Sequence, residues 1–126
     1  MDMTILIAAL IMVESGGDPA AIGDDGLAVG ILQQHPIFVD DVNRILGRSV
    51  YTYMDRNDVE QAVEMAKIWL LHYGGCYEEK FGIPIDYMEA SLIYNRGWKG
   101  FQQMNPLDHG DDEYWKKVAK EIIRIQ

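Results

Sequence analysis

A single glutamate, Glu14, follows directly on the apolar run ILIAALIMV at residues 5–13. A carboxyl group beside a buried helix loses water, and the negative end of the helix dipole also disfavours its charged form, so we expect a raised pKa for Glu14. A carboxyl that keeps its proton near neutral pH can protonate a leaving-group oxygen, as glycoside cleavage requires. The alternative is that Glu14 only marks the point where the chain reaches solvent.

The segment that follows Glu14 is rich in glycine and aspartate and reads GDDGLAVGILQ at residues 23–33. Its three glycines permit tight turns and a close approach of the backbone to a ligand. Their spacing matches neither the dinucleotide fingerprint nor the nucleotide phosphate loop. The segment therefore gives no signal for a phosphate-binding loop.

The same region does not fit a metal site. With Asp18 as the first ligand of a calcium loop, Ala20 and Ile22 stand where oxygen donors are needed. The histidines are scattered along the chain, at His35, His72 and His109. No grouping of histidine and cysteine has metal-ligand spacing. We expect no metal and no cofactor.

Helices must position these groups, because no run alternates strongly with period two. Helical spacing, caps or glycine stops mark five segments, namely residues 2–15, 35–47, 55–75, 85–98 and 111–126. We expect Asp2 or Thr4 to cap the first segment, and Gly16 with Gly17 to end it. The predicted fold is a mainly α, compact, single domain over residues 1–126 with about five to seven helices.

The ends of the later helices are also marked in the sequence. In the longest segment we expect Asp55 or Asn57 to act as the cap, and Gly74 with Gly75 to stop the helix. The fourth segment is expected to fade between Asn95 and Gly97. The fifth has acids in its first turn and basic residues later, which matches the helix dipole.

Charge and composition restrict the partners. The 126 residues include 11 Lys and Arg against 20 Asp and Glu, a net charge of −9, which argues against nucleic acid and predicts no electrostatic steering towards an anionic surface. The single cysteine, Cys76, rules out an internal disulfide framework. The apolar run 5–13 is too short for a membrane span and has no basic flank typical of a signal peptide.

Three motifs occur in order along the chain. Glu14-Ser15 stands at a helix end, Gly26 precedes Gly30-Ile31-Leu32-Gln33, and Ala90 precedes Tyr94-Asn95-Arg96-Gly97. Together they resemble the pattern of the lysozyme-like superfamily of soluble lytic transglycosylases and goose-type lysozymes, over roughly residues 5–100. The resemblance implies a lysozyme-like fold with a glycine-rich active-site loop. It also implies cleavage of the β-1,4 bond between N-acetylmuramic acid and N-acetylglucosamine in bacterial peptidoglycan.

Carried over by position, the resemblance implies a role for each motif residue. Glu14 would be the catalytic acid, and Ser15 would support the site from behind. Gln33 and Asn95 would hydrogen-bond sugar hydroxyls or N-acetyl groups, and Tyr94 would orient Glu14 or the sugar ring. The structural alternatives are a loop-stabilising amide for Gln33 or Asn95 and core packing for Tyr94.

The two branches of this superfamily differ in what attacks the sugar. Lytic transglycosylases use the substrate's own 6-hydroxyl and leave a 1,6-anhydro end, whereas goose-type lysozymes use water. The goose-type Gly-Asp-x-Gly pattern falls on residues 23–26 and places Asp24 in the water-activating position, roughly 6.5 to 9.5 Å from the acid in an inverting enzyme. The further acid of goose-type enzymes is replaced by His35. Asp24 and Asp25 also suit a plain turn.

Other interpretations stay open. Trp98 and Phe101 fit a sugar groove and core packing equally well. A catalytically inactive peptidoglycan-binding or structural domain of a phage particle or secretion machine would keep the same fold. An acidic helical regulator of a basic partner explains the charge but not the three motifs. The expected partner is the peptidoglycan glycan strand. The chain suits a phage lysis enzyme with an export or delivery partner, or a domain of a longer exported protein.

Overall fold

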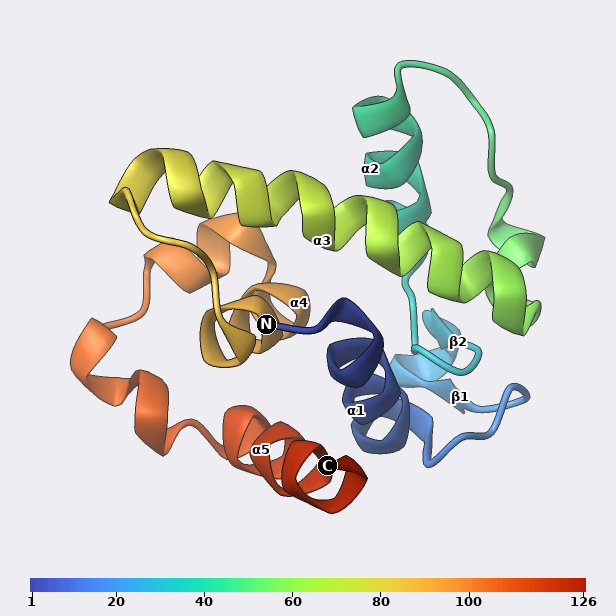
Figure 1. Ribbon diagram of the computed structural model, residues 1–126. Coiled ribbons are helices and arrows are strands. Elements are labelled where there is room, and N and C mark those ends of the chain that lie inside the picture. The colour runs from blue at the N-terminus through green and yellow to red at the C-terminus, as the bar shows by residue number, and fades with distance from the viewer. The chain divides into compact units, whose positions relative to one another are not determined.

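The computed structural model describes all 126 residues, and its internal packing divides the chain into two units. We call residues Met1–Val13 with Leu70–Gln126 the terminal unit, and Glu14–Trp69 the central unit. Five α-helices confirm the predicted mainly α fold (Figure 1). They are α1 (Met3–Ser15), α2 (Pro36–Leu46), α3 (Val59–Phe81), α4 (Tyr87–Gln102) and α5 (Glu113–Ile125). One domain over residues 1–126 stays a prediction.

The first helix, α1, begins where the sequence predicts. Oδ1 of Asp2 accepts hydrogen bonds from the backbone N–H groups of Thr4 and Ile5, at 2.8 and 3.2 Å, which satisfies donors that a helix start leaves unpaired. The helix ends at Ser15, before Gly16. Glu14 therefore lies inside the last turn rather than after it. The buried residues of α1 are Leu6, Ile7, Ala9 and Leu10.

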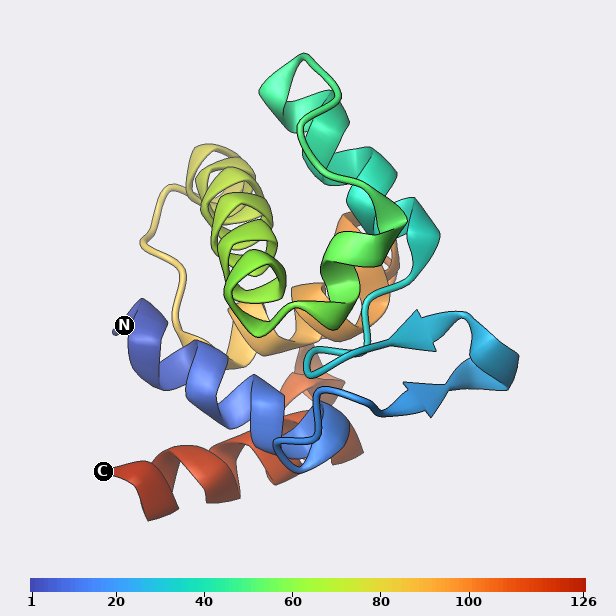
Figure 2. The same cartoon turned by 90° about the vertical axis from the view of Figure 1, so that its right-hand side faces the viewer.

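The central unit contains a small hairpin that the sequence did not predict. Strands β1 (Ile22–Gly23) and β2 (Ala28–Val29) pair antiparallel, and the 3₁₀ helix η1 (Asp24–Gly26) forms the connection. Figure 2 shows the two strands and η1 at the tip. Strands of two residues are too short to produce the alternating pattern by which strands are recognised in a sequence.

The core of the central unit lies between α2 and the first part of α3. The side chains of Val39 and Val42 on α2 are at most 1% exposed, and Trp69 Nε1 donates a hydrogen bond to Asp41 Oδ2 at 2.9 Å. The hydroxyl of Tyr51 donates to Glu64. Burial, with this contact to Glu64, raises the pKa of Tyr51 to about 12.

Helix α3 departs from prediction at both ends. Asp55 and Asn57 do not cap it, because they belong to the 3₁₀ helix η2 (Tyr53–Asn57); instead Asp58 Oδ1 accepts from the N–H of Gln61 at 2.9 Å. Gly74 and Gly75 do not stop it, since the helix continues to Phe81. A glycine inside a helix costs only about 1 kcal/mol, which packing readily outweighs.

In the terminal unit, α4, the 3₁₀ helix η3 (Pro106–Asp111) and α5 pack on one another. Asp86 and Glu89 form a capping box at the start of α4. The predicted fading of this helix is confirmed in part: Gly97 has φ 76° and ψ 167°, which is not helical, and the helix resumes up to Gln102. The residues of α4 and α5 that form the core are Ala90, Ser91, Leu92, Ile93, Phe101, Val118 and Ile122.

Candidate active site

The predicted site residues are divided between the two units. Four belong to the central unit, namely Glu14, Ser15, Asp24 and Gln33. The other two lie on α4 in the terminal unit, namely Tyr94 and Asn95.

The end of α1 is fastened to the glycine-rich loop by Ser15. Its hydroxyl donates a hydrogen bond to the carbonyl oxygen of Ile31 at 2.7 Å, and it accepts one from the N–H of Gly17 at 3.2 Å. Glu14, the residue before it, is half-buried. Through Ser15, the helix turn that carries Glu14 is therefore hydrogen-bonded to the segment that precedes Gln33. The supporting role expected for Ser15 stays a prediction.

The side chain of Gln33 organises the loop from inside. Its Nε2 donates to the carbonyl oxygens of Ala21 and Gly30, at 3.0 and 2.9 Å, and the N–H of Gly30 also donates to the Ala21 carbonyl at 2.9 Å. Both N–H groups of the amide are therefore used within the loop. A contact between Gln33 and a sugar would have to go through Oε1.

The loop is braced by Arg56, a residue that sequence reasoning missed. Its Nη1 donates to the carbonyl oxygens of Leu27 and Gln34, at 3.1 and 3.0 Å, and its Nε donates to the Tyr53 carbonyl at 2.8 Å. The backbone of Arg56 also approaches Gly30 so closely that a Cβ on Gly30 would lie 2.0 Å from the Arg56 carbonyl oxygen. Nothing in the sequence pattern links residues this far apart.

The residues with a strained backbone lie in the same loop. The chain has only three non-glycine residues with positive φ, and all three lie here: Asp24 at 50°, Asp25 at 55° and Gln33 at 50°. A left-handed backbone costs an ordinary residue about 1 kcal/mol, somewhat less for aspartate. Such residues persist where the surrounding structure enforces them, and they are frequent at functional sites.

At the tip of the hairpin, Asp24 is paired with His35. Asp24 Oδ2 lies 2.8 Å from His35 Nε2, and the two side chains are 69% and 37% exposed. An ion pair or hydrogen bond at such a surface contributes about 0 to 1 kcal/mol, which does not clearly offset the strain of two successive left-handed residues. The contribution of the Asp24–His35 pair to folding stability therefore does not by itself explain why position 24 is an aspartate. The one signal for His35 in the sequence was that it stands where goose-type enzymes carry a further acid, shortly after the motif glutamine.

In the terminal unit, the third motif lies on α4 and runs from the buried Ala90 to residues that are partly or fully exposed. Asn95 is exposed and Tyr94 is half-buried, and both precede the break at Gly97. Phe101 is only 3% exposed and stacks with Trp98 at 6.1 Å between ring centroids. Core packing thus accounts for Phe101, while Asn95 remains accessible to a ligand.

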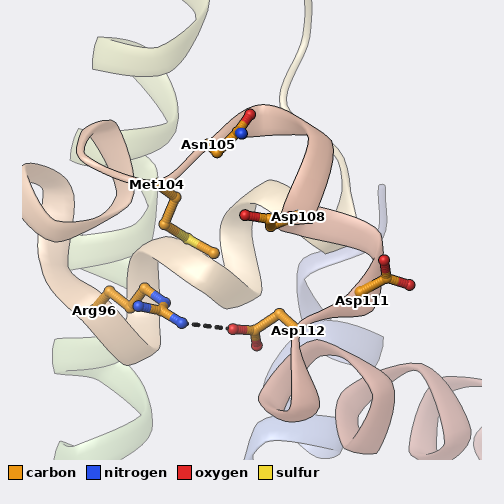
Figure 3. A pocket seen from close by; sticks show the side chains of 6 residues that line it. All are labelled: Arg96, Met104, Asn105, Asp108, Asp111 and Asp112. Carbon is orange, nitrogen blue, oxygen red and sulfur yellow. Dashed lines mark hydrogen bonds and ion pairs between the residues drawn. The ribbon is translucent and has the colours of Figure 1, made fainter.

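A pocket of about 340 Å³ opens elsewhere in the terminal unit. Figure 3 shows its lining, in which Arg96 and Asp112 point towards one another and are joined at 2.7 Å. The lining residues are Arg96, Met104, Asn105, Asp108, Asp111 and Asp112. None of the predicted site residues is among them, and the carboxylates do not form a group arranged to hold a metal ion.

The pair in this pocket makes a testable contribution to stability. Burial acts to raise the pKa of Asp112, but hydrogen bonds from Arg96 and the backbone of Trp115, with the charge of Arg96, outweigh it and hold the pKa below its ordinary value of 3.8. A depressed pKa means stabilisation that is present above pH 3.8 and is lost as the pH falls through the lower folded-state value.

We therefore expect Asp112→Asn to lower the unfolding free energy by about 1 kcal/mol at neutral pH, because Arg96 is partly solvated. The difference from wild type should shrink as the pH falls below about 3.8. Urea unfolding at a series of pH values measures it, with Asp111→Asn as the exposed neighbouring control. A difference that stays constant with pH would contradict the assignment.

The mainly helical fold is consistent with the class of lysozyme-like domains. The family model described as the transglycosylase SLT domain matches residues 2–113. The chain belongs to this family, whose members are lytic transglycosylases that cleave the glycan bonds of peptidoglycan. No curated protein and no solved structure matches the chain significantly. None of its helices combines the length and apolar character needed to cross a membrane.

Proposed function

We propose that this protein cleaves the β-1,4 bond between N-acetylmuramic acid and N-acetylglucosamine, with Glu14 as the general acid. The observation that carries the proposal is the place of Glu14, half-buried in the last turn of α1 and next to a serine that is bonded to the glycine-rich loop. The family match, which includes Glu14, supports the same reaction. Peptidoglycan glycan strands are the proposed partner.

In the proposed reaction, Glu14 acts first as a protonated acid and then as an ionised base. Glu14 gives its proton to the bridging oxygen as the bond from that oxygen to C1 of the muramic acid breaks. The 6-hydroxyl of the same sugar then bonds to C1 and returns its proton to Glu14. The product carries a 1,6-anhydro end, and no water is consumed. Half-burial suits this cycle because it reduces the hydration of the charged form.

The remaining motif residues are proposed to hold the sugar. Asn95 is exposed and presents both an amide donor and an acceptor. Gln33 would accept from a sugar N–H or hydroxyl through Oε1, since its Nε2 is used within the loop. Tyr94 would orient Glu14 or the sugar ring, and Ser15 would hold the end of α1 against the loop.

A second candidate is hydrolysis with Asp24 as the base that activates water. The specific observation in its favour is that Asp24 is held by His35 in a strained backbone conformation at the tip of the braced hairpin. In this case the product would be a reducing end that contains one added water. An inactive peptidoglycan-binding module is the remaining alternative.

Product analysis tests the proposal directly. We expect the wild-type protein to release soluble fragments from purified peptidoglycan, and mass spectrometry to find 1,6-anhydro muramic acid ends among them. Reducing ends alone would replace the transglycosylase with a muramidase that uses Asp24. If nothing is released from any of several types of wall, while the protein still sediments with the wall, the binding module is the correct interpretation.

A further inference from the structure

We propose that Gln34 is a positioning residue for the binding of glycan, and that it acts through its neighbour Gln33. The inference rests on the proposed function, in which Gln33 contacts a sugar through Oε1, and it adds a residue that the three sequence motifs do not include. It starts from the burial of Gln34, which is only 2% exposed. Oε1 of this buried amide accepts no hydrogen bond.

The unpaired oxygen makes Gln34 an unfavourable residue for folding stability. A buried polar atom without a partner destabilises a fold, whereas an apolar side chain of similar shape does not. The Nε2 of Gln34 donates to the carbonyl oxygen of Ala62 at 2.9 Å. That carbonyl lies inside α3, where it also accepts the N–H four residues further on. Because Ala62 would keep its helical bond without Gln34, stability does not explain the glutamine.

Gln34 joins three segments of the central unit. Its backbone N–H and carbonyl exchange hydrogen bonds with those of Val29 in β2, each at 3.1 Å. The same carbonyl accepts a bond from Nη1 of Arg56 in η2 at 3.0 Å, and the side chain reaches Ala62 in α3. The hairpin, η2 and α3 are therefore all fastened to this one residue.

The residue that precedes this junction is strained. Gln33 has a left-handed backbone with φ 50°, which persists only where the surroundings enforce it. On one side its N–H donates to the Gly30 carbonyl at 3.1 Å, and on the other side it is followed by the anchored Gln34. Its Oε1 lies beside Gly23, because a Cβ built on Gly23 would be 2.6 Å away. The anchoring of Gln34 thus helps to set where the proposed sugar acceptor lies.

A binding group that is already held in place loses less conformational freedom when its ligand binds. Gln34→Met keeps the length of the side chain but has no N–H donor for Ala62. The backbone bonds to Val29 and Arg56 do not depend on the side chain, so the loop should still form. Gln33 would be less firmly positioned, and the affinity for glycan should fall while the proposed proton transfer from Glu14 is unaffected.

The test measures fragment release over a range of peptidoglycan concentrations, with thermal unfolding of the same preparations. We expect Gln34→Met to raise the half-saturating concentration about three- to tenfold, which corresponds to about one hydrogen bond. The maximal rate should stay within about twofold of the wild type, because only binding is affected. The melting temperature should equal or exceed that of the wild type. Gln61→Met, the same exchange in α3, is the control and should change none of these quantities.

A second background distinguishes positioning of Gln33 from a general loosening of the loop. In Gln33→Met the proposed sugar acceptor is absent, so Gln34 has no binding group left to position. Adding Gln34→Met to this variant should raise the half-saturating concentration by less than about twofold.

The possible results separate this inference from the proposed function. The inference is overturned if Gln34→Met leaves the half-saturating concentration unchanged, if the increase is as large in the Gln33→Met background, or if the melting temperature falls. A wild type that sediments with peptidoglycan but releases nothing refutes the proposed cleavage alone. The dissociation constants of the same variants, measured by sedimentation, then decide the inference by the same criteria. If the wild type neither binds nor cleaves any wall, both fail.

Discussion

Gly30→Ala is expected to lower the unfolding free energy by about 2 to 4 kcal/mol, because the added methyl group would meet the backbone of Arg56. A Cβ at this position would lie 2.0 Å from the carbonyl oxygen of Arg56 and 3.0 Å from its carbonyl carbon. Both are backbone atoms, so no side-chain rotation can relieve the clash. Overpacking of this kind costs about 1 to 3 kcal/mol, and the left-handed backbone, at φ +86°, adds about 1 kcal/mol.

The loop itself offers a matched control. Gly26 has a similar backbone, with φ +91°, but a Cβ there would meet no atom within 4 Å. Gly26→Ala should therefore cost only the conformational penalty, about 1 kcal/mol. Urea unfolding followed by circular dichroism compares the two variants. Equal losses would show that the approach of the Arg56 backbone is not the reason for glycine at position 30.

The close approach at Gly30 is a long-range contact, and such contacts could not be predicted from the sequence. Local signals were reliable: the cap at Asp2, the acidic first turn of α5 and the break at Gly97 all depend on groups a few residues apart. The prediction that Gly74 and Gly75 end α3 was wrong, because a helix of 23 residues tolerates interior glycines when its faces are packed. Such packing is set by distant residues and leaves no mark in the local pattern.

The same distinction holds for the candidate site. The glycines of the loop were recognised by residue type and spacing. The structural requirement for glycine at position 30, however, comes from a residue distant in the sequence, because the backbone of Arg56 in η2 lies against Gly30. The engagement of Gln33 with two loop carbonyls and the bond from His35 to Asp24 are equally invisible in a linear pattern. Motif matching therefore identified candidate site residues, whose roles stay predictions, whereas the structure shows which of their atoms are used within the loop.

Glu14→Gln is expected to reduce the release of soluble fragments from peptidoglycan by about 10³-fold, within the range that a general acid contributes. The substitution keeps the size and hydrogen-bonding shape of the side chain but removes the proton that the bridging oxygen must receive. It lies in the last turn of α1, where Ser15 holds the helix end to Ile31, so the fold should persist. The rate of fragment release and the unfolding free energy are measured on the same preparations.

Two comparisons make this result specific to chemistry. Glu79→Gln on the exposed side of α3 changes the net charge by the same amount and should leave the rate unchanged. Binding of Glu14→Gln to insoluble peptidoglycan, measured by sedimentation, should stay close to that of the wild type, because the proposed sugar contacts of Gln33 and Asn95 are intact. A variant that binds and still releases fragments at the wild-type rate would remove Glu14 from the mechanism, and the acid would have to be sought among the other carboxyl groups.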